Sequence, residues 1–573
     1  MEYVGENLFI GQLGHFFVIL SFVAALLATF SYFKGSKSIE DGFNNWNSLG
    51  RISFRIHSIG VLGVVLTLFY MLLNGFFEYH YVWQHSNSAM PWRYVFSAFW
   101  EGQEGSFLLW SFWHIVLGNL LILTSKKWEA STMTIFSAVQ VFLSSMVLGI
   151  YIFDYKIGSN PFAVLLREHP DFAGLPLFSN SNYLENLDGR GLNPLLQNYW
   201  MTIHPPTLFL GFASTLVPFA YAIAALWEKK YNEWLDQVIP WSVFGIMVLG
   251  VGILMGGAWA YEALSFGGFW AWDPVENASL VPWITFVGAT HVMIVQKNRG
   301  NSLFTLFFLT IITFILILYS TFLTRSGILG DTSVHAFTDL GMSGQLLIYL
   351  LFFLFLGLAL LLFNFKQFPR DKHEDALWSR EFWIFMGSLV LFLSAFQIIF
   401  ETSKPVINKL LGTNMALSIS AADRRAIYHS WQIPITIVIL ISIGIAQFLK
   451  YKNTKLNEVG KKLIIPLLSS IAVTIAFVIS LEFQNLYHII LLFASLFTVF
   501  ANVSYMIKIL KGKISKAGSS IAHIGFGLII LGALISTSKS DIISKNFTSV
   551  DITQLGEEFN NQENILLFKR SEE

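Results

Sequence analysis

Long apolar stretches recur along most of the 573-residue chain, separated by polar and aromatic loops. A hydrocarbon core about 30 Å thick requires about 20 apolar residues of helix for one crossing. The pattern therefore predicts an all-α integral membrane protein, a polytopic bundle of about fourteen transmembrane helices, within a range of about 13–15. The predicted spans lie near residues 8–32, 57–77, 105–124, 132–153, 206–227, 239–258, 281–296, 302–323, 344–364, 381–400, 431–449, 463–481, 484–505 and 519–537.

Lysine and arginine are concentrated in the short loops on one side of these spans. Short loops rich in positive charge face the cytoplasm, so we expect both termini to be extracytoplasmic. The first apolar stretch has no positive residues ahead of it and is expected to remain a span. The basic loops carry Lys34, Lys37, Arg51 and Arg55; Lys126 and Lys127; Lys229 and Lys230; Lys297 and Arg299; Lys366, Arg370, Lys372 and Arg380; Lys450, Lys452, Lys455, Lys461 and Lys462; and Lys508, Lys511, Lys513 and Lys516.

The loops on the opposite side are longer and rich in aromatic residues. Loops of more than about 12–15 residues are usually functional or disordered, which makes this side the candidate for chemistry. No internal repeat or flexible linker divides the chain, so residues 1–537 are expected to form one transmembrane domain and the polar residues 538–573 an extracytoplasmic tail. The long loops are 78–104, 154–205, 259–280, 324–343 and 401–430.

Composition further narrows the classes of function that this chain can have. Hydrophobic residues make up 54% of the chain and charged residues 13%, against about 25% charged in soluble domains. The formal net charge is zero, and no basic patch indicates nucleic-acid binding. The chain contains no cysteine, which excludes disulfides, thiolate metal sites and a thiol nucleophile of its own. Any thiol chemistry must use the cysteines of a partner.

A tryptophan-rich segment (265–283) lies between the sixth and seventh predicted spans. Its residues 267–283 read GGFWAWDPVENASLVPW. One interpretation is an interfacial belt, because tryptophan settles at headgroup depth. However, a belt requires neither the paired glycines nor the Asp273-Pro274 turn followed by Glu276 and Asn277. The alternative is a shaped surface for a flat aromatic ligand, on which Asp273 and Asn277 pin the turn.

This string resembles the tryptophan-rich "WWD" signature of the haem-handling proteins that include CcmF, CcmC and the CcsA-type synthases. Ala271 and Phe269 depart from it, since CcmF proteins commonly have another aromatic residue at the position of Ala271 and tryptophan at the position of Phe269, which thins the expected stacking surface. Two more strings resemble CcmF in particular, WEGQEGS at 100–106 and GLNPLLQ at 191–197. CcmC is much shorter, and CcsA-type proteins work with a large outer domain. The chain is thus identified as resembling CcmF-type cytochrome c haem lyases from about residue 8 to 537.

Four histidines lie where the resemblance implies haem ligands. His204, followed by two prolines expected to start the fifth helix, and His335 lie in outer loops that flank the tryptophan-rich segment. In CcmF proteins, histidines in such contexts hold the haem that is to be attached. His291 and His523 lie within predicted spans, where polar groups are costly and usually functional. A hydrogen bond between helices is the alternative for this pair, whereas the resemblance implies a b-type haem.

The resemblance implies that the chain attaches haem to the CxxCH cysteines of apocytochrome c through thioether bonds. It implies catalytic roles for His204, His335, Trp270, Trp272 and Asp273, with Glu276 and Asn277 supporting the haem-binding surface. Arg325 is a candidate partner for a haem propionate, because guanidinium pairs with carboxylates. An interfacial arginine with its charged head in water is the alternative.

The expected partners are haem, a CcmE-like haem chaperone, apocytochrome c and a CcmH-like subunit that reduces and binds apocytochrome. The expected location is the bacterial inner membrane. A haem transporter without ligation activity is the competing function. Transporters commonly show internal repeats and a site at the membrane midplane, and this sequence shows no such repeat and has its chemistry in the outer loops.

Overall fold

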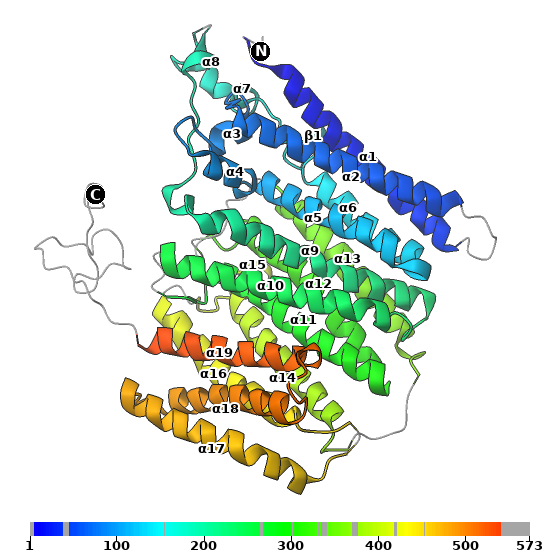
Figure 1. The fold of residues 1–573 in the computed structure, drawn as a ribbon. Coiled ribbons are helices and arrows are strands. Elements are labelled where there is room, and N and C mark those ends of the chain that lie inside the picture. The colour runs from blue at the N-terminus through cyan, green and yellow to red at the C-terminus, as the bar shows by residue number, and fades with distance from the viewer. Residues whose placement is uncertain are drawn as a thin grey trace, which may run out of the picture. The chain divides into compact units, whose positions relative to one another are not determined.

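The structure is a computed structural model that describes residues 5–37, 45–153, 155–180, 182–263, 268–300, 302–330, 333, 341–369, 376–417, 421–451 and 453–539. Long helices dominate it (Figure 1), and 13 described helices are long and apolar enough to cross a membrane. The predicted fold class is confirmed. These helices are α1 (Leu8–Lys37), α2 (Asn45–Leu73), α5 (Gln103–Thr124), α9 (Tyr199–Glu228), α10 (Leu235–Ala263), α11 (Pro274–Arg299), α12 (Leu303–Arg325), α13 (Ser343–Phe365), α14 (Arg380–Thr402), α16 (Ala421–Ala446), α17 (Leu456–Leu481), α18 (Leu486–Lys508) and α19 (Gly518–Ser538).

The predicted span 132–153 is wrong after Ser145. Helix α6 (Glu129–Ser145) has 17 residues and ends well before residue 153. The chain then turns through Gly149, which has φ +60°, into an antiparallel hairpin of β1 (Ile150–Ile152) and β2 (Tyr155–Ile157). A short apolar run fits a strand as well as a helix, so hydropathy alone extended this span too far.

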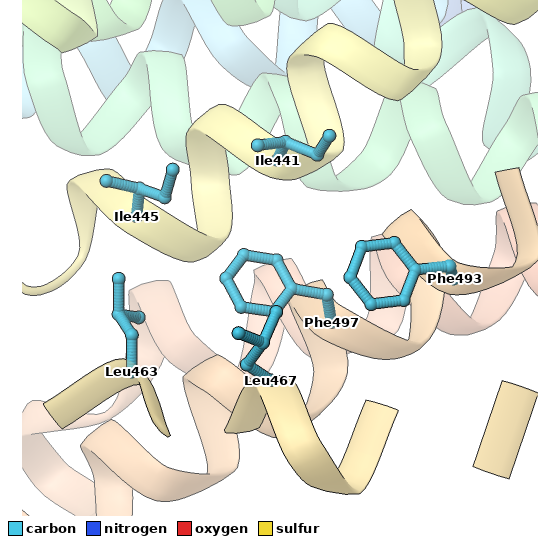
Figure 2. Close-up of a pocket in the computed structure, with 6 residues that line it drawn as sticks. All are labelled: Ile441, Ile445, Leu463, Leu467, Phe493 and Phe497. Atoms are coloured by element: carbon cyan, nitrogen blue, oxygen red, sulfur yellow. The ribbon is translucent and has the colours of Figure 1, made fainter. Parts of the chain in front are cut away.

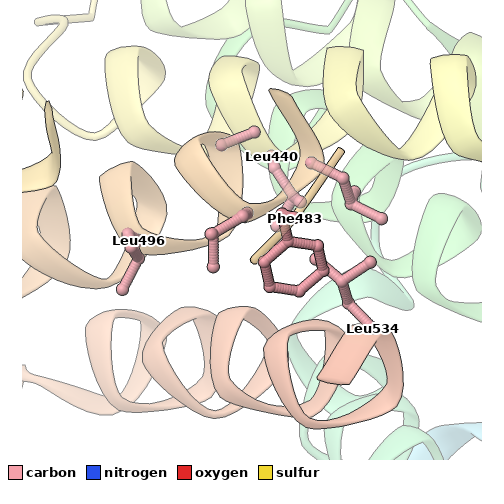
Figure 3. Packing of buried hydrophobic residues seen from close by; sticks show 7 residues of the cluster. Leu440, Phe483, Leu496 and Leu534 are labelled. Atoms are coloured by element: carbon pink, nitrogen blue, oxygen red, sulfur yellow. The ribbon is translucent and has the colours of Figure 1, made fainter. Parts of the chain in front are cut away.

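Two compact units divide the chain. The first contains 1–265, 273–375 and 384–415, and the second contains 266–272, 376–383 and 416–573. In the first unit, α1 packs against α2 and α6, α9 against α10, and α11 against α12. In the second, α18 packs against α16, α17 and α19 around Leu440, Phe483, Leu496 and Leu534 (Figure 3).

Small residues set the distance between helices in the first unit. A Cβ on Gly60 would lie 2.8 Å from the backbone nitrogen of Ser21, and one on Gly211 would lie 2.5 Å from the Leu249 Cα. Lipid tails are as apolar as leucine, so helix association in a membrane depends on close packing rather than on exclusion of water. Glycine permits that packing at the α1–α2 and α9–α10 contacts.

The described residues of the first two long loops form a layer, called here the loop layer (residues 76–101, 146–153, 155–180 and 182–198). The His80 amide donates to the Ala163 carbonyl at 2.9 Å, and the Leu165 amide donates to the Glu78 carbonyl at 2.7 Å. Buried Leu165, Tyr183 and Leu187 form its core. Its short helices are α3 (His80–His85), α4 (Trp92–Glu101), α7 (Leu165–Glu168), η3 (Pro170–Gly174), α8 (Tyr183–Asn186) and η4 (Pro194–Leu196). Elsewhere the chain adds η2 (Lys126–Trp128), α15 (Lys404–Leu411) and η5 (Ile514–Lys516).

Candidate functional site

The helix that carries His204 begins earlier than its prolines indicated. Asn198 caps α9 by accepting the Met201 amide at 3.1 Å, so His204 lies inside the helix and the expected start at Pro205 is wrong. Pro205 cannot donate to the Met201 carbonyl. That carbonyl instead accepts the indole N–H of Trp100 at 2.8 Å. The contact with Trp100, the first residue of the WEGQEGS string, thus satisfies a group that the proline leaves without its helical partner.

The imidazole of His204 is held against α10. Its Nδ1 lies 2.8 Å from the Gly252 carbonyl, and a carbonyl can only accept, so Nδ1 carries the hydrogen and the lone pair of the neutral ring is on Nε2. Gly256 makes room for the ring, because a Cβ there would lie 2.9 Å from His204 Cε1. The Trp259 ring centroid is 5.8 Å from that of His204. This arrangement fits an iron ligand whose orientation is fixed by its other nitrogen.

The tryptophan-rich segment contains a short aromatic stack. The Trp270 and Trp272 rings meet edge to face at 6.1 Å, and Trp272 stacks on Tyr428 at 4.8 Å with 9° between the planes. Trp272 has φ +56°, in the left-handed region, which aromatic residues rarely adopt and which often marks functional sites. Nothing in the local sequence indicated Tyr428, which lies 156 positions after Trp272.

Asp273 begins α11 through a capping box. Its Oδ1 accepts the Val275 amide at 2.9 Å, and the Glu276 carboxylate accepts the Asp273 amide at 3.0 Å. The hydroxyl of buried Ser333 also donates to Asp273 Oδ1, at 2.8 Å. Asn277 reaches further, because its amide donates to the Thr402 hydroxyl of α14 at 3.3 Å. The polar residues after Trp272 therefore fix the start of α11 and its contact with α14.

Trp283, grouped by sequence with the outer tryptophans, has a different place. Its indole N–H donates to the Ile246 carbonyl at 3.0 Å, and a Cβ on Gly250 would lie 2.9 Å from its Nε1. Trp283 therefore packs α11 against α10 and does not belong to the aromatic stack.

The two histidines predicted within spans lie in separate units. His291 is eight residues from the end of α11, and its Nδ1 donates to the Val287 carbonyl at 2.8 Å, which leaves the lone pair on Nε2. His523 lies five residues after the start of α19 and is partly buried.

His335, the second histidine predicted for the outer site, lies outside the described residues. Ser333, two positions before it, is described and is bonded to Asp273.

Arg325 ends α12 and has 8% of its surface exposed. It interacts electrostatically with Glu104 and Tyr81, and the Ser159 hydroxyl donates to Glu104 at 2.5 Å. A snorkelling arginine keeps its charged head in water, so the buried position contradicts that alternative. The sequence did not predict that Arg325, Tyr81 and Ser159 lie around Glu104 at the start of α5. It indicated only that the WEGQEGS string, which contains Glu104, resembles CcmF proteins.

The loop layer packs onto that string. A Cβ on Gly105 would lie 2.3 Å from the Tyr81 hydroxyl, and one on Gly102 would lie 2.6 Å from His85 Nε2. His85 contacts the Glu101 carboxylate. Burial and the neighbouring His80 lower the pKa of His85 to about 3, and burial with the nearby Glu104 charge raises the pKa of the Tyr81 hydroxyl well above its usual value. The two glycines are thus required for the close fit of α3.

An apolar pocket of about 220 Å³ lies in the second unit (Figure 2). It offers no side chain that binds iron or pairs with a carboxylate, so we do not assign it to haem. Its lining residues are Ile441, Ile445, Leu463, Leu467, Phe493 and Phe497.

Comparison with known proteins agrees with this architecture. Residues 100–329 match the family model described as cytochrome C assembly protein, which identifies a polytopic membrane protein of cytochrome c assembly. Cytochrome c-type biogenesis protein CcmF of Pseudomonas fluorescens is 31% identical, over 93% of this chain and 78% of the relative. CcmF of Pseudomonas aeruginosa is 33% identical, over 78% of this chain and 63% of the relative. The chain belongs to the CcmF family.

A solved structure titled Cytochrome c Heme Lyase CcmF has a similar fold, with a TM-score of 0.69 and 21% sequence identity. The match covers 94% of this chain and 79% of that one. The predicted family is confirmed, and with it the role in cytochrome c biogenesis. The matched names favour this role over the haem-transporter alternative.

Proposed function

We propose that this chain is the haem lyase of a cytochrome c maturation complex, with haem and apocytochrome c as its substrates. The observation that carries the proposal is the hydrogen bond from His204 Nδ1 to the Gly252 carbonyl. It orients a neutral imidazole whose Nε2 is suited to iron, beside the ring of Trp259. His335 is the proposed second outer ligand, two positions after Ser333, whose hydroxyl donates to Asp273.

The reaction is the addition of two apocytochrome thiols across the two haem vinyl groups. Each sulfur forms a bond to one vinyl carbon and each thiol hydrogen is transferred to the other, so no oxidant or leaving group is needed. The chain has no cysteine, so both thiols come from the CxxCH motif. The contribution of the protein is to hold the thiols and the vinyl groups together. Positioning of this kind lowers the reaction barrier greatly when the geometry is right.

The tryptophan-rich segment is the proposed support for the haem. Trp270 and Trp272 bracket the edge of the haem ring, and stacking on Tyr428 fixes the position of Trp272. Asp273, Glu276 and Asn277 hold the start of α11 through the capping box and the Thr402 contact. Arg325 is the proposed partner of a haem propionate, because a guanidinium pairs bidentately with a carboxylate.

His291 and His523 are the proposed ligands of a resident b-type haem, which would set the redox state of the outer haem. The Val287 carbonyl orients His291 for this role. A CcmE-like haem chaperone and a CcmH-like apocytochrome-binding subunit are the proposed partners. The proposed location is the bacterial inner membrane, with both termini outside.

The test is maturation of a reporter cytochrome c in cells that depend on this chain. His204→Ala should reduce covalent haem in the reporter at least tenfold, while the variant protein accumulates normally. Thr207→Val, one turn along α9, removes a hydroxyl bonded only to its own helix and should mature the reporter normally. If His204→Ala also matures it normally, this histidine does not hold the substrate haem. Export of free haem without attachment would instead favour a transporter.

A further inference from the structure

The apolar pocket of the second unit lies between two membrane-spanning helices that share one neighbour. Helix α18 packs closely against both α16 and α17. Figure 2 shows Phe493 and Phe497 of α18 between the lining residues of α16 and those of α17. The two rings stack with their centroids 6.1 Å apart and 15° between their planes, and they form the floor of the pocket. Its walls are Ile441 and Ile445 of α16 and Leu463 and Leu467 of α17.

The floor of the pocket is fixed by close packing. Phe497 is buried, and a Cβ on Gly444 of α16 would lie 2.5 Å from its ring, so a larger residue there would displace the ring. All the lining residues are apolar, and the volume is about 220 Å³. A buried water needs two to four polar partners, which these side chains do not offer. An acyl chain instead regains the dispersion contacts that an empty pocket lacks.

The pocket borders the face of α17 that meets lipid. Leu467, which lines the pocket, has 41% of its surface exposed. Exposed apolar residues continue along α17 at Leu468, Ile471 and Ile475. Because α17 is one of the apolar spans, its exposed apolar face lies against the bilayer. A chain that fills the pocket can therefore come from the surrounding lipid.

One end of the pocket lies beside a basic stretch of sequence. Ile445 and Leu463 lie together at that end, opposite to Phe493 (Figure 2). Leu463 directly follows two lysines of α17, and Ile445 is followed within a few residues by the lysine-rich connection to α17. Residues 450–462 contain five lysines and one carboxylate, Glu458. The stretch therefore has an excess of positive charge at the membrane surface.

The lysines nearest the pocket are available to an anion. Glu458 pairs with Lys450 at 3.0 Å, whereas Lys461 and Lys462 form no ion pair within the described residues. Lys461 is exposed and is seven positions before Leu468, so it lies on the lipid-facing side of α17. A positive charge at the surface thus lies next to an apolar pocket that extends into the membrane. A phospholipid combines an anionic headgroup with an apolar chain in the same order.

We propose that this pocket binds one acyl chain of an anionic phospholipid, whose phosphate is held by Lys461 and Lys462. The lipid fills the space between α16 and α17, and so joins two helices that both pack against α18. An anionic headgroup is favoured over a zwitterionic one because basic segments at the membrane surface attract negative charge. The proposal is independent of haem ligation and of the proposed lyase activity.

The headgroup is tested by native mass spectrometry of the purified full-length protein. The protein is incubated with equal amounts of phosphatidylglycerol and phosphatidylcholine that have the same acyl chains. The wild-type protein should retain phosphatidylglycerol at least tenfold over phosphatidylcholine, and Lys461→Gln combined with Lys462→Gln should abolish this preference. The matched control is Lys34→Gln combined with Lys37→Gln, at the basic end of α1, which should keep it.

The pocket is tested by a tryptophan pair on α17. Leu467→Trp fills the pocket and should lower the retention of both lipids at least fivefold. Ile471→Trp places the same ring one turn further along the exposed face, outside the pocket lining, and should retain phosphatidylglycerol as the wild-type protein does. Equal retention of the two lipids by the wild-type protein would overturn the proposal. Normal retention by Leu467→Trp would overturn it too, because the lysines would then bind phosphate without the pocket.

A further measurement needs no substitution. In nanodiscs of phosphatidylglycerol, the backbone amides of residues 453–463 should exchange with deuterated solvent at least threefold more slowly than in nanodiscs of phosphatidylcholine. Residues 34–37, at the basic end of α1, should change much less. A similar change at both places would show a general attraction of lysines to an anionic surface, and would contradict a specific site.

Discussion

The hydroxyl of Ser333 donates to the carboxylate of Asp273 at 2.8 Å, across 60 positions of sequence. Asp273 also caps α11, so one buried carboxylate holds both the start of α11 and Ser333, which is two positions before His335 in the sequence. The proposed outer haem site uses both the tryptophan-rich segment and His335. Loss of this one hydrogen bond should therefore displace the residues that hold the outer haem.

We expect Asp273→Ala to impair both folding and haem attachment. Loss of an N-cap costs about 0.5–2 kcal/mol, and Ser333 also loses its acceptor. Ser333→Ala should have the smaller effect, and the double variant should be no worse than Asp273→Ala alone, because the two share one interaction. Thermal unfolding in detergent and covalent haem in the reporter cytochrome measure the two effects. Ser279→Ala, whose hydroxyl bonds only to its own helix, is the control, and additive effects would contradict the coupling.

We expect His291→Ala and His523→Ala each to abolish the b-type haem absorption of the purified protein, because one axial ligand rarely suffices opposite an open position. The variants should still insert and accumulate. His204→Ala should retain that absorption, since His204 belongs to the outer site. Loss of the absorption in His204→Ala and its retention in the other two would mean that the roles are exchanged.

The predicted orientation is testable because the chain has no native cysteine. Cysteine at Ser179, an exposed residue of the loop layer, should react with an impermeant thiol reagent added outside, whereas cysteine at exposed Ser515 should not. Both should react after the membrane is permeabilised. The reverse pattern would place the basic loops outside. Ser333 is unsuitable for labelling because it is buried against Asp273.

The fit of α3 against the WEGQEGS string should weaken in acid. Burial lowers the pKa of His85 to about 3, below its usual 6.5. Below about pH 6.5 the opened loop layer therefore binds a proton that the closed one does not, and stability falls as the pH decreases toward 3. Backbone hydrogen exchange across residues 76–101 should accelerate over this range. His85→Asn should flatten the dependence, with a remainder from His80, whose pKa burial also lowers; an unchanged profile would exclude His85 as its source.

Hydropathy and short motifs by themselves determined the membrane helices, the start of α11 and the family of this protein. Runs of about 20 apolar residues specify membrane helices because every backbone polar group must be bonded within the bilayer. The Asp273-Pro274-Val275-Glu276 string specifies a helix start, since a capping box needs only residues within one turn. The family and its role in cytochrome c biogenesis also followed from local strings.

Only the tertiary structure decided the contacts that orient the site. Gly252 holds His204 from another helix, and Tyr428 stacks on Trp272 from 156 positions away. Helix α6 ends at Ser145 where apolar sequence continues, and α9 begins before its prolines because Asn198 caps it. Such contacts depend on which helices become neighbours, and the periodicity of one segment carries no information about the side chains that another brings to it.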